Sequence, residues 1–370
     1  MKGFLAGKMA SQAHPITKDP TTTTDVPGMP DKPKLAVYWS ASCGGCEIAV
    51  ANLHEHLLEV ATHFDFMFCP CLLDTKRRDI EALSDQAIAV TLFNGAIRTE
   101  ENLAMARLLR RKSRLLVAMG ACAASGGIPA LANLCGRRDM LSAVYLESPS
   151  LDNPDRLIPR EESKVAEGTL RLPQCLASVM PLGDAVGVDY AIPGCPPESD
   201  QLWQVIQALV ATLHHGAPLP PHGSMLGAGK ASVCDECDRK RSDKKIQGFR
   251  RVWEFVPDPE QCLLEQGLVC MGVATRGGCG GLCPKVNMPC IGCYGSPDGV
   301  YDQGAKLAAT LGSILDIEPI RNQRGEAAIN AQVDAAIAKA PDLAGTACKF
   351  TLASHQYGTD RADDEEISRS

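Results

Sequence analysis

The chain has 370 residues, of which 45% are hydrophobic, so it is long enough and apolar enough to form two domains. Lys and Arg total 37 against 44 Asp and Glu, and the net charge of −7 argues against a general nucleic-acid binder. No apolar run reaches the length of a membrane span, and residues 1–33 lack the apolar core of a secretory signal.

Seventeen cysteines are the most informative feature of the composition. Because no export signal is found, the chain is expected in the reducing cytoplasm, where disulfides rarely persist. A dense set of thiols in that compartment is typical of metal or redox chemistry. The composition therefore predicts metal or cluster ligation and not a disulfide scaffold.

The first part of the chain alternates between strand and helix patterns. Short apolar runs of the buried-strand type occupy 34–40, 64–70, 87–95, 113–122 and 188–197. Helical spacing of apolar residues is found at 46–60, 100–112 and 198–215. The segment 123–187 is interpreted as a helix with long loops. This alternation predicts an α/β fold with a parallel sheet and helices on both faces.

After residue 216 the composition changes. The proline- and glycine-rich stretch 216–230 is interpreted as a linker. Residues 230–300 then contain eight cysteines, many glycines and few periodic apolar runs. Because such a stretch cannot bury much hydrocarbon, we expect bound metal to hold it together. Helices are predicted further on, at 300–315 and 326–340.

Four cysteines follow strands of the predicted sheet. Cys43 and Cys46 follow the first strand, Cys122 the fourth and Cys195 the fifth. Because ligands collect outside the carboxyl ends of parallel strands, these thiols are expected at one edge of the sheet. Four thiolates match the ligand number of a [4Fe–4S] cluster, and the two glycines between Cys43 and Cys46 permit a tight turn around it. The alternative for Cys122 and Cys195 is a small, buried core residue.

The eight cysteines of the second part divide by chain order into two sets of four. The sets are Cys234, Cys237, Cys262 and Cys270, and then Cys279, Cys283, Cys290 and Cys293. A zinc ribbon is the alternative, but its two CxxC pairs usually lie about 15–20 residues apart. Here the CxxC pairs are much further apart, with four more cysteines between them, which favours iron–sulfur ligation.

Other features carry less chemistry. Cys69 and Cys71 end the second strand and are alternative ligands for the first site. The basic run DRKRSDKK (238–245) is interpreted as a solvated face, with docking of a partner as the alternative. No nucleophile–base pair, GxGxxG or P-loop pattern is found. The chain is therefore expected to carry electrons and not to activate a substrate itself.

The order of these motifs resembles the small, electron-transfer subunit of nickel–iron hydrogenases over roughly residues 34–315. The stretches that carry the resemblance are SCGGCE, IPGCPPESDQLW, CDEC, CLLEQGLVCMG and MPCIGC. They are most similar to the cytoplasmic methyl-viologen-reducing group, which couples to heterodisulfide reductase. The resemblance implies a flavodoxin-like domain at 34–216 and an iron–sulfur cluster domain at 217–345. By composition, residues 1–33 are interpreted as a flexible N-terminal extension and residues 346–370 as an acidic tail.

The resemblance also implies three [4Fe–4S] clusters. A proximal set (Cys43, Cys46, Cys122 and Cys195) would face the nickel–iron site of a large subunit, where H₂ is oxidised. A medial set (Cys279, Cys283, Cys290 and Cys293) and a distal set (Cys234, Cys237, Cys262 and Cys270) would lead to an iron–sulfur or flavin acceptor subunit.

Some choices stay open within this resemblance. Membrane-type relatives have a histidine in place of Cys234, so the distal set here would be all-cysteine. Many relatives have a three-iron medial cluster, which leaves open whether Cys283 is a ligand. The first alternative function is a cluster-bearing subunit like that of respiratory complex I, which lacks a second cysteine-rich domain. The other is a zinc-stabilised interaction protein.

Overall fold

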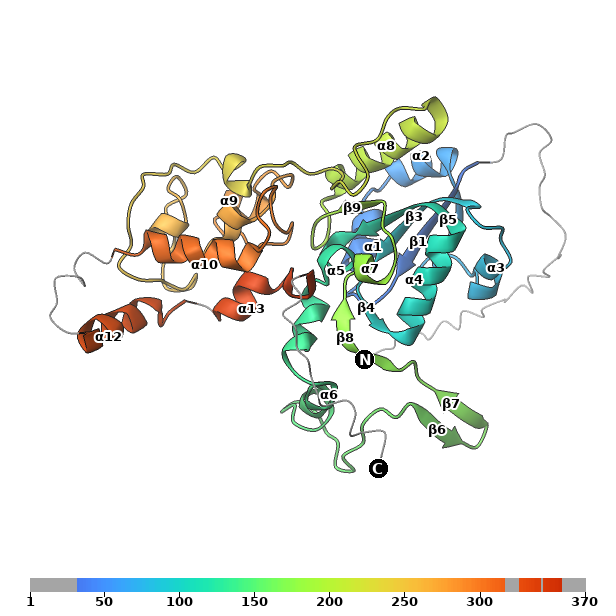
Figure 1. Ribbon diagram of the computed structural model, residues 1–370, viewed down its shortest axis with the longest axis horizontal. Helices are drawn as coiled ribbons and strands as arrows, with labels where there is room; N and C mark the ends of the chain where they lie inside the picture. Colours follow the sequence, from blue (N-terminus) through green and yellow to red (C-terminus); the bar gives the residue numbers. More distant parts are fainter. Residues whose placement is uncertain (1–31, 317–325, 341, 355–370) are drawn as a thin grey trace, which may run out of the picture. The chain divides into compact units, whose positions relative to one another are not determined.

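The computed structural model describes residues 32–316, 326–340 and 342–354 (Figure 1). The described residues from Pro33 onward belong to one compact unit. The predicted extension at 1–33 lies outside the described residues except at its last two positions. In the described part of the chain, no helix combines the length and the apolar composition that crossing a bilayer requires.

A five-stranded parallel sheet is the framework of the first region (Figure 1). Its strands are β1 (Lys34–Trp39), β2 (Asp65–Phe68), β3 (Ile88–Asn94), β5 (Ser113–Met119) and β9 (Tyr190–Ile192). The spatial order is β2-β1-β3-β5-β9, and every neighbouring pair is parallel. This is the flavodoxin-like strand order, so the predicted fold class is confirmed.

The strands form where short apolar runs can be buried on both faces. All seven residues of β3, IAVTLFN, are buried. Because side chains alternate along a strand, Leu92 and Phe93 point to opposite faces and belong to two different hydrophobic clusters. The sheet therefore has a separate core on each face.

Helices cover both of these faces. One cluster joins the sheet to α1 (Gly45–Ala51), α2 (His56–His63) and α8 (Ser199–His215). The other joins it to α3 (Arg77–Glu81), α4 (Glu100–Lys112) and α7 (Leu182–Ala185). Helix α4 begins after Thr99, whose side-chain oxygen accepts a hydrogen bond from the Asn102 amide at 3.2 Å.

One helix predicted from the sequence differs in the structure. The apolar spacing over 46–60 predicts a single helix, whereas the structure contains α1 and α2 with a turn between them. His54 in that turn has a φ of 49°, in the left-handed region that a right-handed helix cannot use. The buried side chain of Leu53 packs this turn against the sheet.

The segment 123–187 contains more regular structure than the sequence predicts. It includes η1 (Ile128–Leu134), α6 (Arg137–Tyr145) and a hairpin of β6 (Glu162–Val165) and β7 (Gly168–Arg171). Strand β8 (Cys175–Met180) pairs antiparallel with β4 (Ile97–Thr99). The hairpin was missed because its residues are mostly exposed and so lack a buried-strand pattern.

The cysteine-rich region is irregular, as predicted. Before residue 300 its helical elements are single turns: η2 (Val233–Asp235), η3 (Leu264–Gln266), η4 (Met271–Ala274) and α9 (Leu282–Lys285). The predicted helices are confirmed as α10 (Gln303–Ile314) and α12 (Glu326–Ile337). Then follow α13 (Leu343–Cys348) and η5 (Leu352–Ser354), and the rest of the acidic tail lies outside the described residues.

Candidate metal centres

The proximal cysteines gather at the carboxyl edge of the sheet. Cys43 lies in the turn from β1 into α1 and Cys46 in the first turn of α1, where the strand order reverses between β1 and β3. Cys122 lies in α5 (Gly120–Ser125), which follows β5, and Cys195 follows β9. Burial, and after it the neighbouring thiols of Cys195 and Cys43, raise the pKa of Cys122 to about 12. The four thiols are thus electrostatic neighbours.

Glycines leave room for sulfur at this edge. A Cβ atom placed on Gly120 would lie 2.5 Å from Sγ of Cys46, and one on Gly127 would lie 2.8 Å from Sγ of Cys122. Both glycines also have positive φ, which other residues rarely adopt. The backbone therefore approaches the thiols more closely than side chains would permit.

Several buried polar atoms at the same edge have no partner among the described residues. They are Oγ of Ser42, Oε2 of Glu47 and Oδ1 of Asn94. Asn94 ends β3, and its Nδ2 donates a hydrogen bond to Oε1 of Glu47. Buried polar groups normally have partners, so these orphans indicate that the edge is built to meet a further group.

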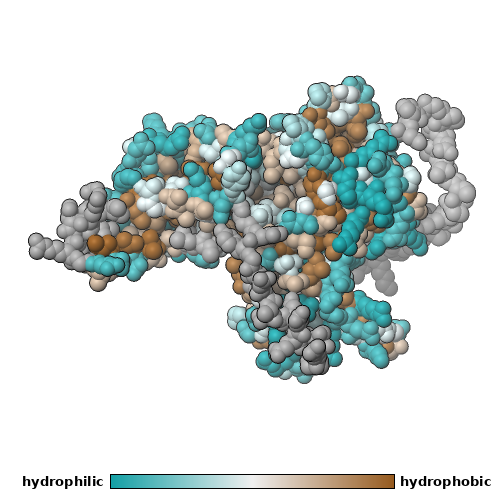
Figure 2. Space-filling view, viewed as in Figure 1, coloured by the Kyte–Doolittle hydropathy of each residue, from teal (hydrophilic) through white to brown (hydrophobic). Residues whose placement is uncertain are grey.

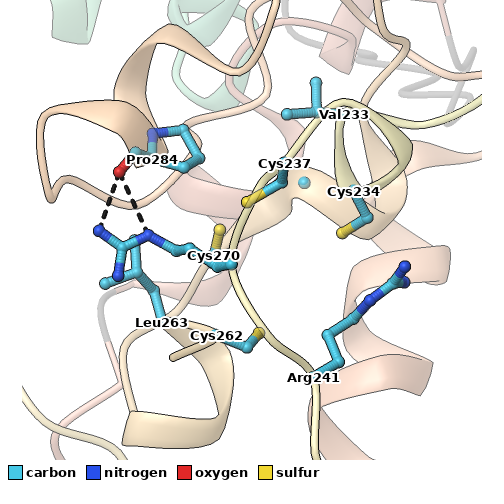
Figure 3. Close-up of a pocket in the computed structure, with 10 residues that line it drawn as sticks. Val233, Cys234, Cys237, Arg241, Cys262, Leu263, Cys270 and Pro284 are labelled. Atoms are coloured by element: carbon cyan, nitrogen blue, oxygen red, sulfur yellow. Dashed lines mark hydrogen bonds between the residues drawn. The ribbon is translucent and has the colours of Figure 1, made fainter. Parts of the chain in front are cut away.

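The distal cysteines surround a small cavity. Cys234, Cys237, Cys262 and Cys270 line it together with Arg241 and Leu263 (Figure 3). Burial and then the Cys262 thiol raise the pKa of Cys234 to about 11, although Arg241 acts in the opposite direction. Burial and the Cys290 thiol raise the pKa of Cys270 to about 12.

The medial cysteines form the third group. Burial, followed by the thiols of Cys290, Cys279 and Cys283, raises the pKa of Cys293 to about 12. Cys279 and Cys283 lie on either side of the tight glycine turn that leads into α9. The four medial thiols are thus electrostatic neighbours, and Cys290 also raises the pKa values of Cys234 and Cys270 in the distal set.

Hydrogen bonds connect neighbouring sets. The backbone amide of Cys290 donates to Sγ of Cys270 at 3.3 Å, which links the medial and distal sets. The backbone of Cys195 hydrogen-bonds the Cys293 thiol, which links the proximal and medial sets. Tyr294 strengthens the second link, because its hydroxyl donates to Oε1 of Gln201 and accepts from the amide of Glu198. The three sets thus form a continuous series.

Raised thiol pKa values describe the chemistry of these sites. A free thiol with a pKa near 12 stays protonated at neutral pH, whereas iron needs the thiolate as its ligand. Bound iron would supply the positive charge that each crowded set lacks. All-thiolate sets of four fit iron–sulfur clusters by donor number and by softness. In the described residues, no three His, Cys, Asp or Glu side chains are arranged to hold a single metal ion.

Five cysteines lie outside the three sets: Cys69, Cys71, Cys135, Cys175 and Cys348. Cys69 and Cys71 follow β2 and are close to one another, with burial as the main cause of their raised pKa values. Neither is among the neighbours that raise the pKa of the proximal thiols.

Sequence reasoning missed two arginines beside the distal set. Arg239 donates to the carbonyls of Pro284, Asp258 and Gln261, and two of these bonds are drawn in Figure 3. Arg241 lines the distal cavity itself. Both belong to the basic run interpreted as a solvated face, and only their spacing from Cys237 could have suggested a role at the site.

This fold defines a protein of the flavodoxin-like class, and its cysteine sets fit iron–sulfur clusters. Residues 43–209 match the family described as NADH ubiquinone oxidoreductase, 20 Kd subunit. The iron–sulfur subunit of the F420-non-reducing hydrogenase of Archaeoglobus profundus is 40% identical over 78% of this chain and 90% of its own length. The corresponding F420-non-reducing hydrogenase subunit of Methanothermobacter marburgensis is 34% identical over 88% and 96%.

The chain therefore belongs to the family that these F420-non-reducing hydrogenase subunits form. It is a hydrogenase subunit of the methyl-viologen-reducing type, as the sequence motifs predict. A solved structure titled "Crystal structure of NAD+-reducing [NiFe]-hydrogenase in the H2-reduced state" is 31% identical, with a TM-score of 0.42, over 51% of this chain and 97% of that chain.

Proposed function

We propose that this subunit relays electrons from H₂ oxidation on a large subunit through three [4Fe–4S] clusters to an acceptor subunit. The observation that carries the proposal is the series of three four-cysteine sets, each hydrogen-bonded to the next. When bound, the clusters would supply one-electron redox centres. H₂ chemistry itself is assigned to the large subunit, as the resemblance to nickel–iron hydrogenase small subunits implies.

The cysteines of this chain would bind the three clusters, and the backbone beside them would shape each cluster site. The proposed ligands are the proximal, medial and distal sets as defined above, with Cys283 completing a four-iron medial site. Backbone amides beside the sulfurs, such as that of Cys290, would tune the potential of each site by hydrogen bonding. Gly120 and Gly127 bring the backbone close to the proximal sulfurs, where a larger residue would collide with them.

The proposed partners fit the two ends of the series. Cys43 is exposed at the sheet edge, and two apolar residues near it in the sequence, Trp39 and Ile48, are 44% and 61% exposed. An exposed thiol among apolar side chains suits a large subunit that covers the proximal site.

The space-filling view shows that apolar surface (brown) is interspersed with polar surface across the face in view (Figure 2). The acceptor is proposed to be an iron–sulfur or flavin subunit of a heterodisulfide reductase complex.

The test uses the native complex purified without oxygen. H₂-dependent reduction of methyl viologen is compared between the wild type and Cys43→Ser, with Cys135→Ser as a matched control. Cys135 is an exposed cysteine outside the three sets, so its replacement should leave the rate unchanged. Loss of viologen reduction in Cys43→Ser alone supports the relay, whereas a normal rate in that variant contradicts it.

A further inference from the structure

Arg241 is a positive charge at the distal cavity that forms no ion pair with another described residue. It lines the cavity together with all four distal cysteines (Figure 3). Its side chain is exposed, and among the described residues it forms no hydrogen bond or ion pair. Its charge acts on Cys234 in the direction that favours the thiolate.

The other charged residues nearby are already engaged. Arg239 gives its guanidinium hydrogens to carbonyls and to the side chain of Asn287. The carboxylate of Glu236 accepts the amide of Gly280 at 3.0 Å, on the side of the medial set. Asp235, a carboxylate that also feels the charge of Arg241, accepts hydrogen bonds from the amide and hydroxyl of Ser232. Arg241 is thus the uncommitted cation beside the distal thiolates.

We infer that Arg241 raises the reduction potential of the distal site and so favours an electron at the outer end of the series. The inference rests on the proposed function, since it requires a cluster on the distal set. A fixed cation stabilises the reduced state because reduction adds one negative charge. In the described residues, the charged groups that act on the pKa values of Cys46, Cys122 and Cys195 are other thiols and Glu47. The charge of Arg241 therefore distinguishes the two ends of the relay.

The experiment is a redox titration of the intact complex, followed by electron paramagnetic resonance. The distal signal is identified as the one that Cys237→Ser alters. In Arg241→Gln, we expect the ratio of reduced to oxidised distal cluster at a fixed potential to fall roughly threefold to tenfold. A tenfold fall corresponds to a reduction potential that is about 59 mV lower. Arg241→Lys should restore most of the wild-type value because it keeps the charge.

The control is Lys244→Gln, which removes the same charge from an exposed residue that does not line the cavity. Its effect should be clearly smaller. In the wild type, higher salt should shift the distal potential downward by screening Arg241, and Arg241→Gln should lose this response. The salt response of the wild type is measured without any substitution at the site.

Three results separate the possible failures. An unchanged potential in Arg241→Gln, with normal iron content and an unchanged salt response, overturns the inference alone. Equal shifts in Arg241→Gln and Lys244→Gln also overturn it, because the effect would then be one of net charge. If the wild-type complex has no distal cluster signal at all, the proposed function fails and the inference fails with it.

Discussion

The two cysteine-bearing regions reach the same chemistry by different means. The sheet region has two large hydrophobic clusters, one on each face, and its cysteines are attached at the strand ends. The cysteine-rich region has a single smaller cluster, which itself contains Cys290 and is packed by the partly buried Cys262, Cys270 and Cys279. In the first region a stable fold positions the thiols, whereas in the second the thiols are part of what must hold the fold together.

The largest expected effect is on the cysteine-rich region, which we propose is held together by bound metal. After removal of iron by a chelator under reducing conditions, residues 230–300 should lose most protection from amide hydrogen exchange, because few apolar side chains remain to order them. The sheet strands should keep their protection. Hydrogen exchange followed by mass spectrometry measures the protection of both regions. An equal loss of protection in both would contradict the claim that only the cysteine-rich region needs metal to fold.

The sheet core provides the converse test. Replacing Phe93, which is fully buried in β3, by alanine should lower the free energy of unfolding of the sheet region by about 3–5 kcal/mol. Leu58→Ala, at a side chain that is 74% exposed, should change it by less than about 0.5 kcal/mol. Denaturant unfolding of the iron-free protein measures both, and similar values for the two variants would argue against a metal-independent core.

The contact between the regions is the next test in order of size. Tyr294→Phe removes the hydroxyl that donates to Gln201, a residue that is 3% exposed and already has an unpartnered Nε2. We expect a loss of about 1–2 kcal/mol in stability of the complete subunit, because buried Gln201 is left without its donor. Tyr301→Phe, at a side chain 93% exposed, is the control. If the two variants have the same thermal unfolding temperature, the hydrogen bond between Tyr294 and Gln201 does not stabilise the contact between the regions.

The smallest effect concerns pH and is confined to the sheet region. Burial alone would raise the pKa of Asp189, but hydrogen bonds from the Leu116 amide, Arg110 and His222 outweigh burial and hold the pKa below its usual range. A lowered carboxyl pKa stabilises the fold above the unfolded value of about 3.9, and this contribution is lost as the pH falls through the folded value.

Asp189→Asn should therefore cost about 1 kcal/mol or less at neutral pH, since His222 is largely exposed. The difference from the wild type should shrink below about pH 4. Denaturant unfolding at several pH values measures the difference. A gap between the two proteins that stays constant down to pH 3 would show that the Asp189 carboxylate contributes nothing through its charge.

The sequence predicts the sheet region better than the contacts between sites. Continuous apolar runs such as that of β3 are local signals, and chain order after each strand was enough to place Cys122 and Cys195 at one edge. The hairpin of β6 and β7 is exposed and therefore left no such pattern. Contacts such as that between Cys195 and Cys293 join residues far apart in the chain, so spacing could not reveal them.

The most direct test of the relay is a chemical count on the anaerobically purified subunit in its native complex. Iron and acid-labile sulfide attributable to this chain should each be about twelve atoms, as three [4Fe–4S] clusters require, and Cys234→Ser should lower both counts. Absence of sulfide, or zinc in place of iron, would contradict the assignment of all three cysteine sets.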